Sequence, residues 1–303
     1  MQAAQTVFLL EKSVGVSVCV SGIATCSLIF NRRFCMSYEP SFNELINRLS
    51  AFVQVDAIML SGSAASGTAD EHSDYDLYVY LNAPLAAGER VSALKGLFSC
   101  IEFNNTFWET EDDGVLLEGR PIDILYRETG WISQLLADKL DRHLADTGYT
   151  TCFWANILAS KILFDRKGWA HELIARCSVP YPEPLRRAVI AKNHPLLKQQ
   201  IPAYYHQIEK ALVRHDGVCV NHRIAAFVAS FADIVFAINR VPHPGEKRLV
   251  MHMERCALHP DGLGSDLDEL FEAGARMEMR TLDVLDRLID GLDEILRRED
   301  LII

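Results

Sequence analysis

The hydrophobic pattern of the chain changes once, near residue 129, and this change limits the folds that are open to it. Between residues 57 and 126 short apolar runs and alternating patterns occur, whereas from Thr129 onward apolar residues recur at helical spacing. A period of two is typical of strands, and a spacing of three to four residues is typical of helices. The sequence therefore predicts an α+β fold, in which a domain of strands and helices is followed by a helical bundle.

The first domain is predicted to begin with a helix. Ser41 and Glu44 have the spacing of a capping box, and apolar residues follow them at helical intervals. Residues 74–81 alternate and are rich in β-forming side chains, which predicts a strand. The other elements predicted here are a strand at 57–60, a helix within 88–98, and strands over 101–110 and 115–126, the last interrupted by a turn or bulge at 118–119.

The second part, residues 129–303, carries helical patterns that are interrupted by prolines at 180–184 and 242–244. A helix is predicted over 156–165, and Glu246 is predicted to begin another, because an acidic residue favours the positive end of a helix. Leu285, Leu288 and Leu292 belong to an apolar stripe in the closing region, whose other faces are acidic. These patterns predict an all-helical second domain with a solvated outer surface.

Length and charge restrict the domain number and the partners. A chain of 303 residues exceeds the size at which a single core usually stops growing, so two domains are expected. The formal net charge of −11 argues against a nucleic-acid partner, because binding to a polyanion comes chiefly from Lys and Arg. A small anionic ligand remains compatible with this charge.

The eight cysteines lack the spacing of a zinc site and the density of a disulfide scaffold, so we expect reduced thiols in a cytoplasmic protein.

Residues 13–30 form an uncharged run that ends before two arginines. A membrane span needs about twenty mostly apolar residues, and this run is diluted by serine, threonine and glycine. A signal peptide carries its positive charge before the apolar stretch rather than after it. We therefore expect no membrane association. Residues 1–36 are predicted to be an N-terminal extension outside the fold, and residues 37–128 the first domain.

Two aspartates separated by one residue are the main chemical signal. Asp74 and Asp76 lie in a predicted strand and therefore point to the same face. Like charges at close range oppose joint ionisation unless a cation lies between them. Mg²⁺ binds a few carboxylates, keeps several waters and accepts phosphate oxygens from a substrate. The pair therefore predicts a magnesium site that works on a phosphorylated substrate.

Two further features fit this chemistry. Gly62 and Ser63 follow the first strand and offer backbone N–H groups and a hydroxyl to phosphate, with the glycine permitting close approach. Asp123 lies between two isoleucines, so on a strand it would face the layer opposite to them. It would then lie beside the aspartate pair if the two strands are neighbours.

Taken together, these residues resemble the DNA polymerase β-type nucleotidyltransferase superfamily. The closest resemblance is to aminoglycoside-type (antibiotic) nucleotidyltransferases and their uncharacterised bacterial relatives. It is carried by Gly62-Ser63, by Ser73-Asp74-x-Asp76-Leu77 and by a later strand aspartate. The resemblance spans about residues 37–300 and implies a small mixed-sheet catalytic domain followed by a helical substrate-binding domain, residues 129–303.

The resemblance also implies roles for the site residues. Gly62, Ser63 and Ser73 would bind a nucleoside triphosphate. Lys161 is a further candidate for phosphate binding, although it could equally face solvent. Asp74 and Asp76 would each bind both of two Mg²⁺ ions. Asp123 would bind only the first ion. The metal-binding and catalytic assignments are Asp74, Asp76 and Asp123.

Asp123 is the candidate general base because it would lie beside the attacking hydroxyl. Structural alternatives exist for several of these residues. Asp74 could cap a turn, and Ser63 could cap a helix. Asp123 could instead form a structural ion pair with Arg120 or Arg127.

The leading functional prediction is an enzyme that transfers a nucleoside monophosphate, in the first place AMP from ATP, to a hydroxyl of a small molecule with release of pyrophosphate. A protein-nucleotidylating (AMPylating) enzyme of the toxin–antitoxin type is the alternative, and the long helical domain argues against it because minimal members lack one. A non-catalytic nucleotide-binding module is the third possibility. Neither the nucleobase nor the acceptor has a signature in the sequence.

Overall fold

The structure is a computed structural model, and it describes residues 38–62, 74–107 and 109–302. Tertiary contacts divide the chain into two units, Met1–Ser37 and Tyr38–Ile303. The predicted N-terminal extension lies outside the described residues, and so do Ser63 and Ser73.

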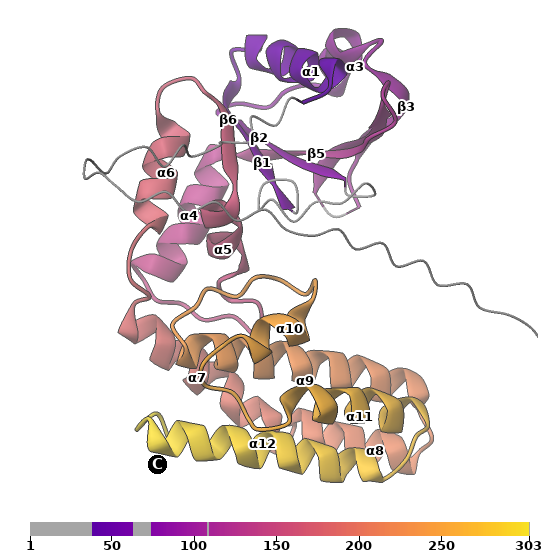
Figure 1. Cartoon of the computed structure of the whole chain (residues 1–303), viewed down its shortest axis with the longest axis vertical. Coiled ribbons are helices and arrows are strands. Elements are labelled where there is room, and N and C mark those ends of the chain that lie inside the picture. Colours follow the sequence, from indigo (N-terminus) through magenta and orange to yellow (C-terminus); the bar gives the residue numbers. More distant parts are fainter. Residues whose placement is uncertain (1–37, 63–73, 108, 303) are drawn as a thin grey trace, which may run out of the picture. The chain divides into compact units, whose positions relative to one another are not determined.

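A mixed sheet of six strands is the centre of the first part of the described chain (Figure 1). The strand order is β3-β4-β5-β2-β1-β6; β2 and β5 run parallel, and the other neighbours are antiparallel. The strands are β1 (Val55–Ser61), β2 (Tyr75–Leu81), β3 (Phe98–Asn105), β4 (Thr110–Leu116), β5 (Pro121–Glu128) and β6 (Lys161–Asp165). The prediction of a mixed sheet followed by helices is confirmed.

One face of the sheet is covered by α1 (Pro40–Ala51) and α3 (Ala87–Leu94). Phe42 of α1 is fully buried there against alternate residues of β1 and β2. The predicted capping box is not formed: Glu39 occupies the N-cap position without a side-chain hydrogen bond, and Ser41 lies inside the helix, where its hydroxyl donates to Glu118. Pro40 explains the earlier start, because its fixed φ suits the first helical position.

The opposite face of the sheet is covered by α4 (Thr129–Leu140), α5 (Cys152–Ala159) and α6 (Trp169–Cys177). Tyr78 and Tyr80 of β2 belong to one buried cluster with Trp154 of α5, and this cluster continues into the remaining helices. Those helices are α7 (Glu183–Leu197), α8 (Tyr204–Val213), α9 (Gly217–Ile238), α10 (Leu249–Glu254), α11 (Leu263–Ala275) and α12 (Arg280–Arg298). One apolar core therefore joins the sheet to the helical region.

The predicted helix over 156–165 is wrong in its second half. α5 ends at Ala159, Ser160 is extended, and the next five residues form β6 antiparallel to β1. A short apolar run fits a strand as well as a buried helix, and the open edge of β1 decides between them by offering backbone partners. The sheet therefore includes a strand from beyond the predicted first domain, residues 37–128.

The region from residue 98 to residue 128 forms three strands where two were predicted. The turn predicted at 118–119 is confirmed, with Gly119 at φ +91°, and it separates β4 from β5. The extra strand, β4, carries three acidic residues and therefore gave no apolar signal. One of these, Asp112, is fully buried and binds Arg90 through two hydrogen bonds of 2.9 and 3.0 Å.

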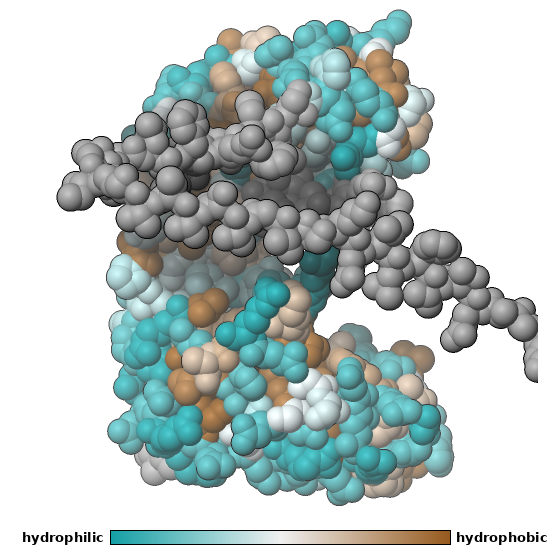
Figure 2. Space-filling view, viewed as in Figure 1, coloured by the Kyte–Doolittle hydropathy of each residue, from teal (hydrophilic) through white to brown (hydrophobic). Residues whose placement is uncertain are grey.

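The helical region is organised around α9 and α12. The apolar stripe predicted for the closing helix is confirmed, since Leu285, Leu288 and Leu292 are fully buried. Hydrophilic residues make up most of the visible surface of this part, with hydrophobic patches among them (Figure 2). Among the described residues, only α9 is long and apolar enough to cross a membrane by length and composition, and 61% of that stretch is buried inside the protein. It packs against α7, α8 and α11, as the core helix of a bundle does.

The five cysteines that the structure describes are all free.

Candidate active site

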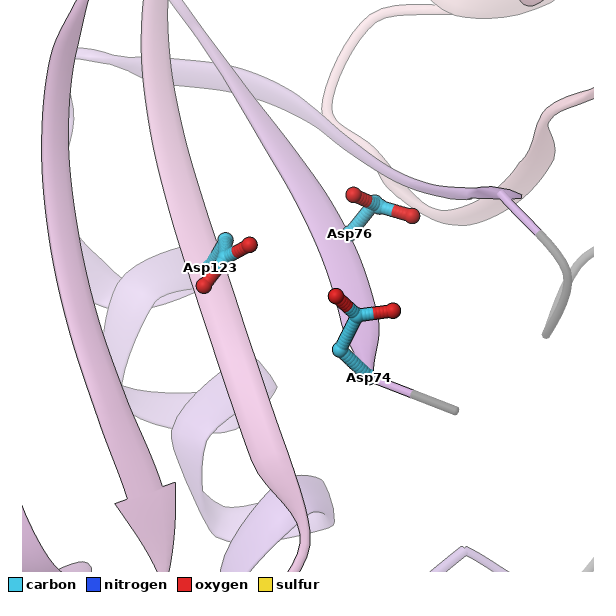
Figure 3. Close-up of side chains that lie close together, drawn as sticks. All are labelled: Asp74, Asp76 and Asp123. Atoms are coloured by element: carbon cyan, nitrogen blue, oxygen red, sulfur yellow. The ribbon is translucent and has the colours of Figure 1, made fainter. Parts of the chain in front are cut away.

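Three aspartates converge at the N-terminal end of β2. Asp74 immediately precedes the strand, Asp76 lies within it, and Asp123 of β5 is the direct partner of Asp76 in the parallel register. A carboxylate oxygen of each lies within 4.8 Å of a carboxylate oxygen of the other two (Figure 3). The structure therefore brings together the three acidic residues that the sequence singled out.

Strand alternation explains why these carboxylates share a face. Leu77 and Ile122 are fully buried in the core beneath α1, so their neighbours Asp76 and Asp123 point to the other side of the sheet. The parallel pairing of β2 with β5 then places the two carboxylates side by side. All three aspartates are partly buried.

Burial and mutual repulsion make this cluster unfavourable when it is fully charged. Burial, reinforced by Asp113 and then by Asp74 and Asp76, raises the pKa of Asp123 to about 6. Burial and the nearby charge of Asp74 also raise the pKa of Asp76. The Lys247 ammonium acts in the opposite direction on both groups. Three clustered carboxylates in this state are suited to a divalent cation, which supplies the missing positive charge and prefers oxygen ligands.

The ion pairs that would have given Asp123 a purely structural role are not present in the described part of the chain. Arg127 binds Glu109 through two hydrogen bonds of 2.6 and 2.7 Å, and Arg120 lies 3.6 Å from Glu39. Both arginines are thus engaged with other carboxylates. Among the described residues, the carboxylate of Asp123 therefore lies with those of the other two aspartates of the cluster.

Gly62 directly follows β1 and lies beside the cluster. It adopts φ +64°, and a Cβ added at this position would overlap the Oδ2 atom of Asp76. Both facts favour glycine, because only glycine enters this conformation at little cost and has no side chain to collide. Gly62 thus lies beside Asp76, and its predicted close approach to a phosphate stays a prediction. The proposed roles of Ser63 and Ser73 stay predictions, since both lie outside the described residues.

A pocket of about 300 Å³ opens beside Asp76. Its walls come from the sheet, from α5 and from the segment between α9 and α10. The lining residues are Gly62, Asp76, Tyr78, Arg127, Cys152, Phe153, Asn156, Pro244, Gly245, Glu246 and Lys247. The last seven come from outside the predicted first domain, and sequence reasoning missed their contribution.

Two polar atoms of residues in the pocket wall lack partners among the described residues. Nη1 of Arg127 is a buried donor without an acceptor, and Oδ1 of Asn156 is a buried acceptor without a donor. The amide nitrogen of Asn156 donates to Ser61 Oγ at 2.8 Å and to the Tyr78 hydroxyl at 3.3 Å. Buried polar atoms are usually hydrogen-bonded, so these two atoms, which have almost no exposed surface, are exceptions within the residues that form the pocket wall.

Glu246 and Lys247 do not begin a helix, contrary to the prediction. α10 begins at Leu249, and Arg248 occupies its N-cap position with a left-handed backbone. Residues 246 and 247 instead belong to the pocket wall. No local pattern distinguishes such a loop from a helix start, because its role depends on which distant surface it meets.

Lys161 is not brought together with the aspartates. It opens β6, where its partner Leu60 faces the core beneath α1. Its ammonium donates to the Tyr38 hydroxyl at 2.9 Å and lies 5.0 Å from the centre of the same ring. The residue is therefore on a strand and not on the predicted helix, and its binding of phosphate stays a prediction.

Comparisons with known proteins match two successive parts of the chain to domain families. Residues 42–141 match the family model of the nucleotidyltransferase domain, and residues 153–249 match that of a domain of unknown function, DUF4037. The search of curated proteins found no match.

Two solved structures are similar to the chain. A nucleotidyltransferase-like protein from Exiguobacterium sibiricum is 12% identical, with a TM-score of 0.42 over 86% of this chain and 75% of that protein. An aminoglycoside 6-adenyltransferase from Bacillus subtilis is 10% identical, with a TM-score of 0.29 over 84% of this chain and 90% of that protein. The family match over residues 42–141 encloses all three converging aspartates. The chain thus carries a nucleotidyltransferase domain of the DNA polymerase β type, followed by a helical region.

Proposed function

We propose that the protein is a metal-dependent nucleotidyltransferase that moves a nucleoside monophosphate, AMP from ATP, onto a hydroxyl of a small molecule. The observation that carries this proposal is the convergence of Asp74, Asp76 and Asp123 inside a domain of the nucleotidyltransferase family. The family supports a nucleotide substrate. The family does not specify ATP or a hydroxyl acceptor, so these two choices are part of our proposal.

The donor set suits magnesium. Three carboxylates with oxygens within 4.8 Å of one another offer only hard oxygen ligands, and among the described residues no histidine or thiolate, the ligands that favour zinc, joins them. Asp74 and Asp76 would hold two ions, and Asp123 would add a ligand to the first. Magnesium bound there would lower the pKa of the attacking hydroxyl and offset the charge of the phosphates.

The proposed reaction is a displacement at the α-phosphorus. The acceptor's hydroxyl oxygen forms a bond to that phosphorus, while the bond to the oxygen that bridges the α- and β-phosphates breaks. Pyrophosphate leaves with the electron pair of this bond. The hydroxyl proton passes to a carboxylate oxygen of Asp123, which faces the cluster from the neighbouring strand.

The pocket is suited to a small-molecule substrate. Its volume of about 300 Å³ is at the lower end of small-molecule sites. The rings of Tyr78 and Phe153 supply apolar wall, and Arg127, Asn156 and Lys247 are polar lining residues. This mixture suits a polar molecule with an apolar face.

The decisive experiment incubates the purified protein with Mg²⁺, each nucleoside triphosphate and a panel of hydroxyl compounds. We expect pyrophosphate release with ATP and a nucleotidyl adduct of the acceptor by mass spectrometry.

Asp123→Asn should still bind Mg–ATP but lose transfer by about 10²-fold or more. Asp56→Asn is the matched control: Asp56 lies on β1 and accepts a hydrogen bond from Asn82, which an asparagine can also accept.

Other results would point to the alternatives. A nucleotidyl adduct on a protein instead of a small molecule would identify the protein-nucleotidylating activity. Tight binding of Mg–ATP without pyrophosphate release would identify a non-catalytic module. Normal transfer in Asp123→Asn would remove the proposed base from the mechanism.

A further inference from the structure

The segment between α9 and α10 carries a cation to the acidic cluster. Residues 244–247 line the pocket together with Asp76 and Gly62, although they follow a helix of the helical core. Lys247 is exposed and, in the part of the chain that is described, makes no ion pair or hydrogen bond through its side chain. It shares the pocket wall with Asp76, and its charge acts on Asp76 and Asp123.

Lys247 and Asp76 line one pocket of about 300 Å³, a volume that can hold a phosphate group. Among the described residues, Lys247 forms no ion pair with any of the three carboxylates, so its ammonium is available to an anion in this pocket. The ammonium group is a compact point charge with three donors, which suits phosphate oxygens. Gly62, whose turn approaches Asp76, lies in the same pocket wall.

His243 fixes the segment that carries this lysine. Its side chain is fully buried between the rings of Tyr149 and Phe236, with both ring centres 4.8 Å away. Its Nδ1 accepts a hydrogen bond of 3.0 Å from the backbone N–H of Gly245, so the proton of the neutral ring is on Nε2. Burial lowers the pKa of His243 to about 4, which keeps the ring neutral and Nδ1 an acceptor at neutral pH.

The same anchor ties the segment to the catalytic sheet. The backbone N–H of His243 donates to Thr151 Oγ1 at 2.7 Å, and Thr151 immediately precedes α5. α5 in turn reaches the sheet through the bond of 2.8 Å from Asn156 to Ser61, the residue before Gly62. A chain of direct contacts therefore sets the position of residues 244–247 relative to the acidic cluster.

We propose that Lys247 binds the phosphates of the nucleoside triphosphate and that His243 is the positioning residue that holds it in place. This inference rests on the proposed function, because it assigns a residue to the triphosphate of that reaction. It adds a binding group from the helical region to a site whose carboxylates all come from the sheet. It also gives the buried histidine a role that requires no proton transfer.

The test of Lys247 is Mg–ATP binding, measured by calorimetry without an acceptor. Lys247→Ala should weaken binding by about tenfold or more, which corresponds to the loss of one charge-assisted contact. Lys247→Arg should retain most of the affinity, because the charge and donors remain. Lys210→Ala, on the exposed face of α8, is the matched control and should bind as the wild type does.

The outcomes separate this inference from the proposed function. If the wild type binds Mg–ATP and Lys247→Ala binds it equally well, Lys247 does not hold the phosphates, while the nucleotidyltransferase proposal stands. If Lys247→Ala loses turnover at unchanged affinity, the residue acts in chemistry and the inference is again wrong. If the wild type does not bind Mg–ATP at all, both proposals fail.

Two variants test the positioning role while leaving Lys247 in place. His243→Leu removes the acceptor at Nδ1, and Thr151→Val removes the oxygen that accepts from the His243 N–H. Each should weaken Mg–ATP binding, and His243→Leu should add little to Lys247→Ala in the double variant, because both act on the same contact. His243→Asn should restore affinity, since its side-chain oxygen can accept from the Gly245 N–H in a local turn. Wild-type affinity in a folded His243→Leu or a folded Thr151→Val protein would overturn the positioning role.

Discussion

At the scale of single residues, Asp74 and Asp76 are two carboxylates that repel each other within one site. Each contributes charge to the cluster and no apolar packing to the core. Asp74→Asn and Asp76→Asn should therefore lower turnover by about 10²-fold or more while the fold persists. Without metal their thermal midpoints should equal or exceed that of the wild type, because a like-charge repulsion is relieved. Pyrophosphate-release assays and melting curves with and without Mg²⁺ check this, and near-normal turnover in both variants would contradict it.

Gly62 provides a second prediction at this scale. Gly62→Ala should sharply weaken Mg–ATP binding, because the new Cβ would collide with Asp76 Oδ2. Gly119→Ala is the matched control: Gly119 also has a positive φ, but a Cβ there meets no atom within 4 Å. Both variants carry the backbone cost of about 1–2 kcal/mol, and only the first disturbs the site. Calorimetry and thermal midpoints separate the two effects, and equal losses of affinity would show that strain alone is responsible.

At the scale of elements, a buried polar contact joins the segment before α5 to α9. Asp233 of α9 accepts hydrogen bonds from the Thr150 backbone N–H at 3.1 Å and from the Thr150 hydroxyl at 2.6 Å. Asn193 of α7 donates to the same carboxylate at 3.3 Å. Burial, only partly offset by the Thr150 bonds, raises the pKa of Asp233 from 3.8 to about 7.

This raised pKa predicts a pH-dependent stability. The folded protein holds the Asp233 proton more tightly than the unfolded chain, so its stabilising effect is complete below about pH 4 and is lost as the pH rises to about 7. Asp233→Asn removes this titration. We expect the thermal midpoint of the wild type to fall relative to that of the variant between pH 5 and pH 8. A constant difference over this range would show that Asp233 is ionised throughout.

β6 shows why an element can be misassigned from sequence. Its residues continue the apolar run of α5, and only the pairing of Leu60 with Lys161 and of Ile58 with Phe164 makes them a strand. This pairing joins segments about 100 residues apart. Local propensity therefore could not decide the assignment, and the open edge of β1 did.

At the scale of the whole molecule, the sheet and the helical region share one core. Met59 and Tyr80 of the sheet are fully buried in the same cluster as Leu136 of α4 and Trp154 of α5. A fragment of residues 37–128 lacks these helices and also lacks β6. It should show no cooperative thermal transition in circular dichroism, because about half of the buried sheet surface would face water.

A chain that begins at Met36 is the control for this fragment. It keeps every described residue of both core clusters, so it should melt cooperatively and at the midpoint of the full chain. A cooperative transition in the fragment of residues 37–128 would show that the sheet folds independently. A lowered midpoint in the chain from Met36 would show that the preceding residues contribute to stability.

The sequence alone determined the features that depend on neighbouring residues. The alternation around Asp76 and Asp123 assigned each carboxylate to one face of its strand, and the small-residue turn at Gly62 followed from its composition. The helical periodicity after Thr129 likewise predicted the bundle. Such patterns are local because each side chain's direction is set by the backbone period.

The tertiary structure alone decided which distant segments meet. The parallel pairing of β2 with β5 brought the two strand carboxylates together, and packing of the helical region placed Lys247 in the pocket wall. Neither contact has a periodic signature, because the free energy that forms it comes from burying apolar surfaces far apart in the chain. Residues that act from a loop, as we propose for Lys247, become visible only when the surfaces beneath that loop are assembled.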